Sequence, residues 1–264
     1  MTHLLQLNFD LWTRIERSTP STSTGIDFYR VIFCASFLAF YRHKIIDFGQ
    51  VPQALFDPPV FSFAFLFNDF PSSSVANLLY FVVGICIFLV GLGWHKRLNG
   101  LLAFCVYCIL LNFQYSFGKI DHGILVPACI LIFSLNDWNT TKPAKGWRMP
   151  VNSTALLAVV LCFGMFSAGF YKALYWIDFD ITQNGFARWF YSGYYNLGRD
   201  KLLASWVPSF PHIMLEMMDY TAVAFELSPA IFLLVGRRSW NFWLCLAIVF
   251  HIANTLLLLS LIHI

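Results

Sequence analysis

Charged residues are scarce in this sequence: Asp, Glu, Lys and Arg make up only 12% of its 264 residues, against about 25% in soluble globular proteins. Hydrophobic residues make up 58%, aromatic residues make up 19%, and the mean hydropathy is +0.65. This composition excludes a soluble globular protein and predicts an all-α, polytopic integral membrane protein. The net charge of +3 is too small and too evenly spread to indicate nucleic-acid binding.

The sequence also lacks the common motifs of catalytic and metal sites. It contains no glycine-rich phosphate loop, nucleophile elbow, metalloprotease motif or repeat of solenoid period. Cys105 and Cys108 form one C-x-x-C, but the second pair that would complete a zinc site is missing. All seven cysteines fall in apolar runs, where a free cysteine behaves as a small hydrophobic residue. The cysteines therefore predict packing rather than chemistry.

The N-terminal segment is more polar than the rest of the chain. Leu4–Ile15 is interrupted by polar and charged residues, which is atypical of a signal peptide and indicates a short helix on the membrane surface. Ser18–Gly25 is a Ser/Thr/Pro linker, after which Asp27 can cap a helix. We therefore expect residues 1–25 to form an interfacial helix and a linker, and residues 26–264 to form one transmembrane domain.

Seven apolar segments predict membrane spans. Phe28–Tyr41 and Gly123–Leu135 are well below the roughly 20 residues that a perpendicular spanning helix needs, so each is expected to be tilted, half-buried in the bundle or extended by its flanks. The region Pro52–Phe70 is interrupted by Pro58 and Pro59, so it predicts a re-entrant or interfacial loop instead of a span. The seven segments are approximately Phe28–Tyr41, Val75–Trp94, Leu98–Phe117, Gly123–Leu135, Thr154–Trp176, Asp219–Val235 and Trp240–Ile262.

The distribution of Lys and Arg predicts the orientation. With the N-terminus inside, ten of these residues lie on the inner side, six lie outside, and Lys172 is within a span. The positive-inside rule therefore favours a cytoplasmic N-terminus. The Lys142–Arg148 loop is then cytoplasmic and the Asp178–Tyr220 connection is outside. The sequons at Asn139 and Asn152 also fall inside, which makes them chance matches.

Lys172 lies near the end of Ala155–Tyr175, an apolar stretch with no other charge. A central lysine costs roughly 2.5–3.5 kcal/mol in a spanning helix, so such residues face a cavity or a partner. Because Lys172 is near the end of the span, snorkelling to the interface is the alternative. Gly164, Ala168 and Lys172 share one helix face, which predicts close approach of a ligand or simply of another helix. Desolvation there favours the neutral amine, which can act as a base.

Four other polar residues lie in or at the edges of apolar segments: His122, Glu226, His251 and Asn254. His251 and Asn254 share one face of the last predicted span, so we expect them to contact another helix or a ligand. Glu226 precedes Pro229 by three residues, and its alternative role is to bond polar groups that a proline kink leaves unsatisfied.

Five short motifs follow one another along the chain. They are Gly91–Arg97 (GLGWHKR), Lys119–His122 (KIDH), Ala168–Lys172 (AGFYK), Glu226–Leu234 with Arg237–Ser239, and His251–Asn254 (HIAN). In this order and spacing, the motifs resemble those of the HTTM (horizontally transferred transmembrane domain) family, which includes the vitamin K-dependent gamma-glutamyl carboxylase. The resemblance extends from about Phe28 to the end of the chain.

The resemblance implies a specific chemistry. In the carboxylase, a lysine after Ala-Gly deprotonates reduced vitamin K, oxygen then generates a strong base, and that base removes the gamma-proton of a peptide glutamate before carbon dioxide adds. It implies Lys172 as the base and His122 as the residue that assists at the glutamate. It places His251, Asn254 and Glu226 at the quinone pocket. We expect Lys172 and His122 to face one another across a cavity that His251 also lines.

The resemblance also bears on substrate and location. It implies a secreted peptide or protein substrate, a quinol cofactor, and a bacterial plasma membrane. Tyr171 precedes the lysine where the animal enzyme has a second lysine, and the carboxylase's extramembrane portion has no counterpart after the last predicted span. A second hypothesis is a non-enzymatic membrane protein for export, maturation or immunity of a secreted peptide, as in the HTTM protein encoded with a sporulation-delaying toxin. A transporter ranks third, because no inverted repeat is evident.

Overall fold

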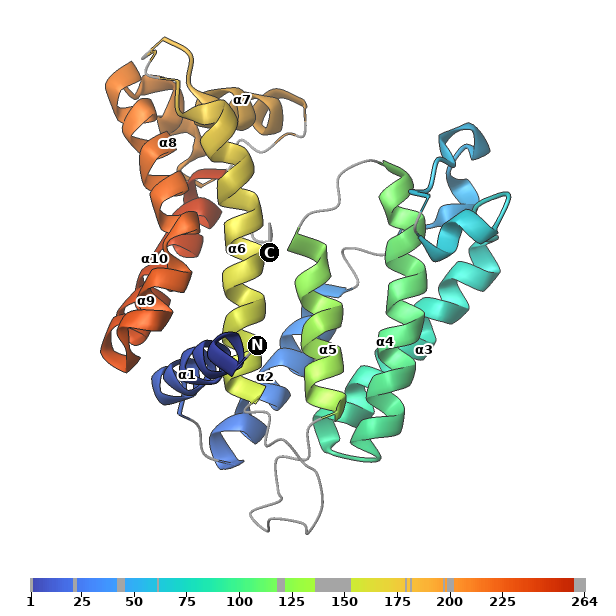
Figure 1. Ribbon diagram of the computed structural model, residues 1–264. Coiled ribbons are helices and arrows are strands. Elements are labelled where there is room, and N and C mark those ends of the chain that lie inside the picture. Colours follow the sequence, from blue (N-terminus) through green and yellow to red (C-terminus); the bar gives the residue numbers. More distant parts are fainter. Residues whose placement is uncertain are drawn as a thin grey trace. The chain divides into compact units, whose positions relative to one another are not determined.

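The computed structural model of the protein is helical (Figure 1). It describes residues 2–20, 23–41, 46–60, 62–117, 122–135, 153–178, 180, 182–196, 198 and 202–258. Within these ranges the chain forms α-helices and short 3₁₀ helices, and no strand occurs. The chain divides into two compact units, Ser21–Leu157 and the combination of Met1–Pro20 with Ala158–Ile264. The all-α class expected from the sequence is confirmed.

The described residues of the unit Ser21–Leu157 include four complete α-helices. Each helix contacts the next in the chain, so that α3 packs against α2 and α4, and α4 packs against α5. The packing is close where small residues meet: Gly91 lies against Cys34, and Gly100 lies against Ser134. The four helices are α2 (Ser23–Tyr41), α3 (Ser73–Leu92), α4 (Lys96–Gln114) and α5 (Leu125–Leu135).

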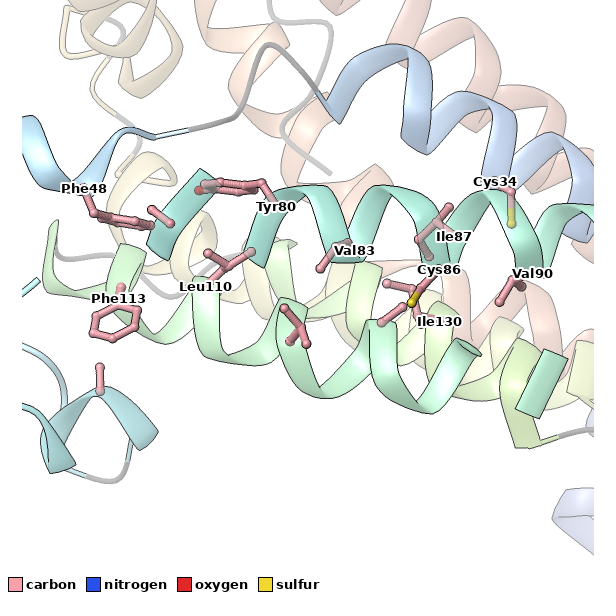
Figure 2. Packing of buried hydrophobic residues seen from close by; sticks show 14 of the residues in the cluster. Cys34, Phe48, Tyr80, Val83, Cys86, Ile87, Val90, Leu110, Phe113 and Ile130 are labelled. Atoms are coloured by element: carbon pink, nitrogen blue, oxygen red, sulfur yellow. The ribbon is translucent and has the colours of Figure 1, made fainter. Parts of the chain in front are cut away.

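Apolar side chains of α3 and α4 form the core of this unit (Figure 2). Val83 and Ile87 of α3 are almost completely buried between the helices. At one end of the core, Phe48 is fully buried and its ring lies 5.7 Å from that of Phe70 and 5.8 Å from that of Phe113, measured between ring centroids. This aromatic cluster anchors the segment between α2 and α3 to the helices.

In the described part of that segment, residues 46–60 and 62–72, the helices are 3₁₀ helices: η2 (Phe48–Gln50), η3 (Gln53–Leu55) and η4 (Phe63–Leu66). The amide of Phe70 donates to Oε1 of Gln53 at 2.8 Å, and the amide of Phe63 donates to Oδ1 of Asn112 in α4 at 3.1 Å. The structure therefore agrees with the prediction that Pro52–Phe70 is not a spanning helix. Its position relative to a membrane stays a prediction.

The second unit contains the N-terminal helix and the C-terminal helices. Helix α1 packs on α9 and α10, while α7 packs on α8. An aromatic and aliphatic core under α7 includes Phe186, Phe190 and Leu215. The elements are α1 (Thr2–Ser18), α6 (Ser153–Trp176, whose first residues belong to the other unit), α7 (Gly185–Asn196), η7 (Ala204–Ser209), α8 (His212–Leu227), α9 (Pro229–Val235) and α10 (Arg237–Leu258).

Four described helices are long and apolar enough to cross a membrane, namely α3, α4 extended to Phe117, α6 and α10. In α10, only 11% of the most apolar window is buried by protein. A fifth candidate span in the described residues arises only if α8 and α9 form one broken span, and these two helices meet at a bend of 47°. The seven-span count is therefore not confirmed, since neither α2 nor the 11-residue α5 is among the candidates.

Two predicted boundaries were wrong. Asp219–Val235 is not one continuous helix, because α8 begins at His212 and breaks before Pro229, which cannot donate a backbone hydrogen bond. The linker was also predicted too long, since α2 already begins at Ser23. The predicted cytoplasmic loop Lys142–Arg148 and both sequon asparagines lie outside the described residues.

Candidate functional site

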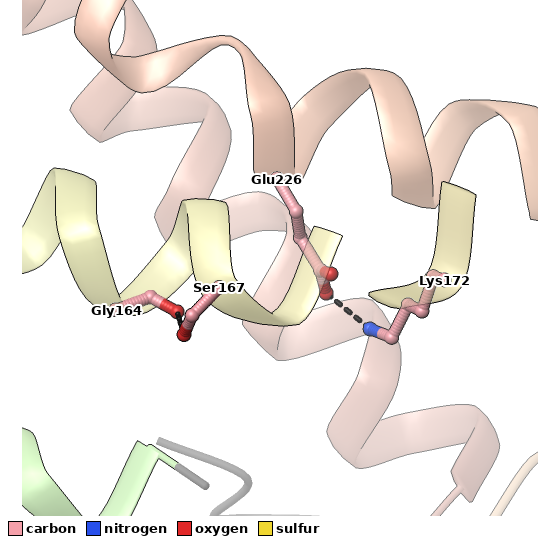
Figure 3. Close-up of polar contacts among 4 residues, drawn as sticks. All are labelled: Gly164, Ser167, Lys172 and Glu226. Carbon is pink, nitrogen blue, oxygen red and sulfur yellow. Dashed lines mark hydrogen bonds and ion pairs between the residues drawn. The ribbon is translucent and has the colours of Figure 1, made fainter. Parts of the chain in front are cut away.

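Lys172 of α6 and Glu226 of α8 form an ion pair through Nζ and Oε1 (Figure 3). The Glu226 side chain is 6% exposed and the Lys172 side chain is 25% exposed. The amine therefore points to a buried carboxylate on another helix, which argues against the simple snorkelling alternative. Of the residues predicted for the site, these two are brought into direct contact.

A glycine allows the two helices to meet at this point. Gly169 lies one turn before Lys172, and a Cβ built on it would lie 3.1 Å from the carbonyl carbon of Glu226 and 3.1 Å from the amide nitrogen of Leu227. The backbones of α6 and α8 thus approach closely beside the ion pair, as small residues permit in membrane helices. The contact with α8 is made by Gly169. The small-residue face predicted from Gly164, Ala168 and Lys172 lies next to it on α6.

The amine has a second neighbour. Nζ of Lys172 lies 5.2 Å from the centre of the Trp176 ring, within the range of a cation–π interaction. The second carboxylate oxygen of Glu226, Oε2, is buried and has no hydrogen-bond partner among the described residues. The site therefore combines an amine paired with a carboxylate, an aromatic face, and a buried carboxylate oxygen that accepts no hydrogen bond from the described residues. A hydroxyl group would satisfy that acceptor.

The break between α8 and α9 does not depend on Glu226. Pro229 lacks an amide hydrogen, which leaves the carbonyl of Phe225 without its helical donor. That carbonyl instead accepts from the hydroxyl of Ser228 at 2.9 Å and from Nε1 of Trp243 in α10 at 3.4 Å. The alternative role of Glu226 as the group that repairs the proline kink is therefore wrong, because Ser228 and Trp243 perform it.

The predicted pocket residues of α10 are half-buried. His251 has its ring 5.6 Å from that of Phe250 in an edge-on arrangement, and its carbonyl accepts from the Thr255 hydroxyl at 2.8 Å. Asn254 lies one turn further along α10. Among the described residues, the Lys172 amine contacts Glu226 and Trp176, and a direct pair with His251 is absent. The quinone-pocket role of His251 and Asn254 stays a prediction.

His122 lies in η6 (His122–Ile124) of the unit Ser21–Leu157, and its side chain lies outside the described residues. Its predicted pairing with Lys172 therefore stays a prediction.

A second polar cluster, in α8, was not predicted from the sequence. Asp219, which is fully buried, accepts hydrogen bonds from the amides of Gly185 at 2.8 Å and Phe186 at 2.6 Å, so it caps the N-terminus of α7. Beside it, Oε2 of Glu216 accepts from Nδ2 of Asn184 at 2.8 Å. The available signal was the presence of two carboxylates at i and i+3 in a mostly apolar helix.

No group of three or more His, Cys, Asp or Glu side chains in the described part of the chain is arranged to hold a metal ion. No protein-family model, curated protein or solved structure matches the chain.

Proposed function

We propose that the protein is an integral membrane enzyme of the HTTM type that modifies glutamate in a secreted peptide by a quinol- and oxygen-dependent reaction, gamma-carboxylation. The supporting observation is the Lys172–Glu226 pair, an amine held by a buried carboxylate inside apolar helices. Its lysine is the one that the AGFYK motif places in the base role. The proposal includes seven spans, a cytoplasmic N-terminus and a bacterial plasma membrane.

The residues around Lys172 suit a hydroquinone. The open Oε2 of Glu226 can accept a hydrogen bond from a phenolic O–H, and the Trp176 ring offers an aromatic surface beside the amine. A reduced quinone would supply, together with oxygen, the base strength that a lysine lacks for removing a glutamate gamma-proton. A site of this kind draws a lipid-soluble cofactor directly from the bilayer.

In this proposal the chain itself positions groups and moves one proton. The ammonium of the Lys172–Glu226 pair must first release its proton, and the neutral Nζ then accepts the phenolic proton. Glu226 fixes the amine and stabilises the ammonium that results. Oε1 already contacts the amine, so the proton gains an ion pair where it arrives. The reaction also requires that water, which would quench a strong base, be kept from the site by the apolar helices and the surrounding lipid.

The test is mass spectrometry of a glutamate-containing secreted peptide encoded beside this chain, made with and without the protein. We expect the peptide to gain one carboxyl group per modified glutamate, and only when quinol and oxygen are present. Lys172→Arg keeps the positive charge and can stay paired with Glu226, but it cannot act as a base, so the modification should disappear. Ser192→Ala, an exposed change in α7, is the control and should leave the modification intact.

The ion pair also favours the non-enzymatic alternative, because a lysine–carboxylate pair between two membrane helices can serve simply as an interhelical clamp. In that case Lys172→Arg retains the clamp and the biological activity. A peptide that matures normally with Lys172→Arg, with no change in its mass, would support a partner in export, maturation or immunity and contradict the enzyme.

A further inference from the structure

The turn between α3 and α4 is tightly built. Helix α3 ends at Gly93 with φ of 81°, and the amides of Gly93 and Trp94 donate back to the carbonyls of Val90 and Leu89, both at 3.0 Å. His95, with φ of 42°, is a second left-handed residue. Nδ2 of Asn99 then closes the turn by donating to the carbonyl of Trp94 at 2.7 Å. The backbone of this turn is therefore held in a fixed geometry.

A buried arginine from α2 reaches the same turn. Arg30 is 7% exposed, and its Nη2 lies 3.6 Å from the position that a Cβ on Gly93 would occupy. Nη1 is taken by Asp27 at 2.5 Å, but Nε is buried and has no hydrogen-bond partner among the described residues. Nε and Nη2 form one edge of the guanidinium, a two-donor fork that matches two oxygens of a phosphate or carboxylate.

Other positive groups follow this turn directly in the chain. Helix α4 begins at Lys96 without a side-chain cap, so the positive end of a 19-residue helix faces the turn. Lys96 and Arg97 occupy its first two positions. Against these cationic groups stands the carboxylate of Asp27, already paired with Arg30. Among the described residues, Arg30 and Lys96 outnumber Asp27, so the charge next to the turn favours an anion.

The location of the turn indicates the source of that anion. It joins α3 and α4, both long and apolar enough to cross a membrane, and a turn between two spanning helices would lie at the level of the lipid headgroups. Trp94 is 58% exposed, as expected for an aromatic residue at the membrane interface. We propose that Arg30, Lys96 and the N-terminus of α4 bind the phosphate of an anionic phospholipid headgroup. This site belongs to the unit Ser21–Leu157 and is independent of the proposed enzymatic reaction.

The experiment is native mass spectrometry of the full-length protein in detergent, titrated with phosphatidylglycerol and, separately, with phosphatidylcholine. We expect the wild type to prefer phosphatidylglycerol. Arg30→Gln removes the fork and Lys96→Gln removes one charge at the helix start, and each should weaken phosphatidylglycerol binding by about tenfold, the loss expected for one charge-assisted contact. Lys96 is partly exposed, so its variant tests the site even if Arg30→Gln fails to fold.

The matched control is Arg237→Gln. Arg237 is the first residue of α10, as Lys96 is the first residue of α4, and it belongs to the other unit. The same loss of one positive charge should leave phosphatidylglycerol binding unchanged. Equal weakening by Lys96→Gln and Arg237→Gln would overturn the site, because it would show only a general effect of charge.

Inorganic phosphate distinguishes the two sources of the ligand. We expect millimolar phosphate to leave the bound phosphatidylglycerol in place and to give no thermal stabilisation of delipidated protein. Stabilisation by inorganic phosphate that depends on Arg30, without a preference between the two lipids, would overturn the assignment to a lipid headgroup.

Discussion

Gly169 lies so close to Glu226 that a Cβ on the glycine would come within 2.8 Å of the Glu226 Cβ. Glu226 can therefore reach Lys172 because Gly169, on the facing helix, has no side chain. Any added atom must push α6 and α8 apart at the site.

Gly169→Ala should lower the melting temperature in detergent, because overpacking costs about 1–3 kcal/mol and exceeds the helix propensity gained. Circular dichroism during heating measures the effect. Gly84→Ala is the control, since Gly84 lies in α3 and nothing surrounds its Cβ position within 4 Å. That variant should be neutral or slightly stabilising. Equal destabilisation by both changes would contradict the close contact.

A double-mutant cycle on Lys172→Met and Glu226→Leu should reveal a coupling of about 0.5–3 kcal/mol. Each single change leaves one charge without its partner in an apolar environment. The destabilisations caused by the two single changes should therefore add up to more than the destabilisation caused by the double change. The measurement is the unfolding free energy in mixed micelles. Additive effects would show that the two groups do not interact in the membrane.

Asp219→Ala should fray the start of α7, because two backbone amides lose their acceptor at a cost of about 1–2 kcal/mol. Hydrogen exchange at Gly185 and Phe186 reports this directly and should accelerate. Glu216→Gln is the matched control, since glutamine retains a carbonyl oxygen for Asn184. It should leave the exchange of both α7 amides unchanged.

Much of the helical architecture could be predicted from apolar runs alone. At the span expected over Val75–Trp94 the structure has the helix Ser73–Leu92, whose end could be predicted because the long apolar run is followed by a glycine. The Lys172–Glu226 contact could not be predicted in this way, since it joins residues 54 positions apart and depends on how two helices pack.

The cap of α7 was missed for a related reason. Cap signals are normally local, one to three residues from the helix start. Here the acceptor is Asp219, more than thirty residues later in the chain. The break before Pro229 was visible in the sequence, but the partners that satisfy the freed carbonyl were not, because Trp243 comes from another helix.

Single-cysteine labelling tests the number of spans. With seven spans and a cytoplasmic N-terminus, the α3–α4 turn is inside, so Trp94→Cys should resist a membrane-impermeant thiol reagent until the cells are permeabilised. If α2 and α5 do not cross, the same turn lies outside and is labelled at once. Ser192→Cys is outside in both topologies and is the positive control. All native cysteines are first replaced by alanine.

The turn after α6 should show a local dependence on pH. Asp180 accepts hydrogen bonds from the hydroxyl of Thr182 at 2.7 Å and from its amide at 2.9 Å, and these bonds lower the pKa of Asp180 below its ordinary value of 3.8. The stabilisation is complete above pH 3.8 and is lost as the pH falls through the lowered pKa. Carbon-13 NMR of the labelled carboxyl measures this pKa. Thr182→Val should raise it towards 3.8.

The sparse burial of α10 also governs how this helix can change over evolutionary time. Its outward side chains, such as Ile248 and Val249, are more than 60% exposed. In a membrane, lipid chains would surround them. Lipid does not distinguish one aliphatic side chain from another, so these positions can drift among Leu, Ile, Val and Phe. Trp243 is 1% exposed and donates to a carbonyl that has lost its helical partner. In a saturation mutagenesis library, α10 should therefore divide into a permissive outer face and a narrow intolerant line that includes Trp243.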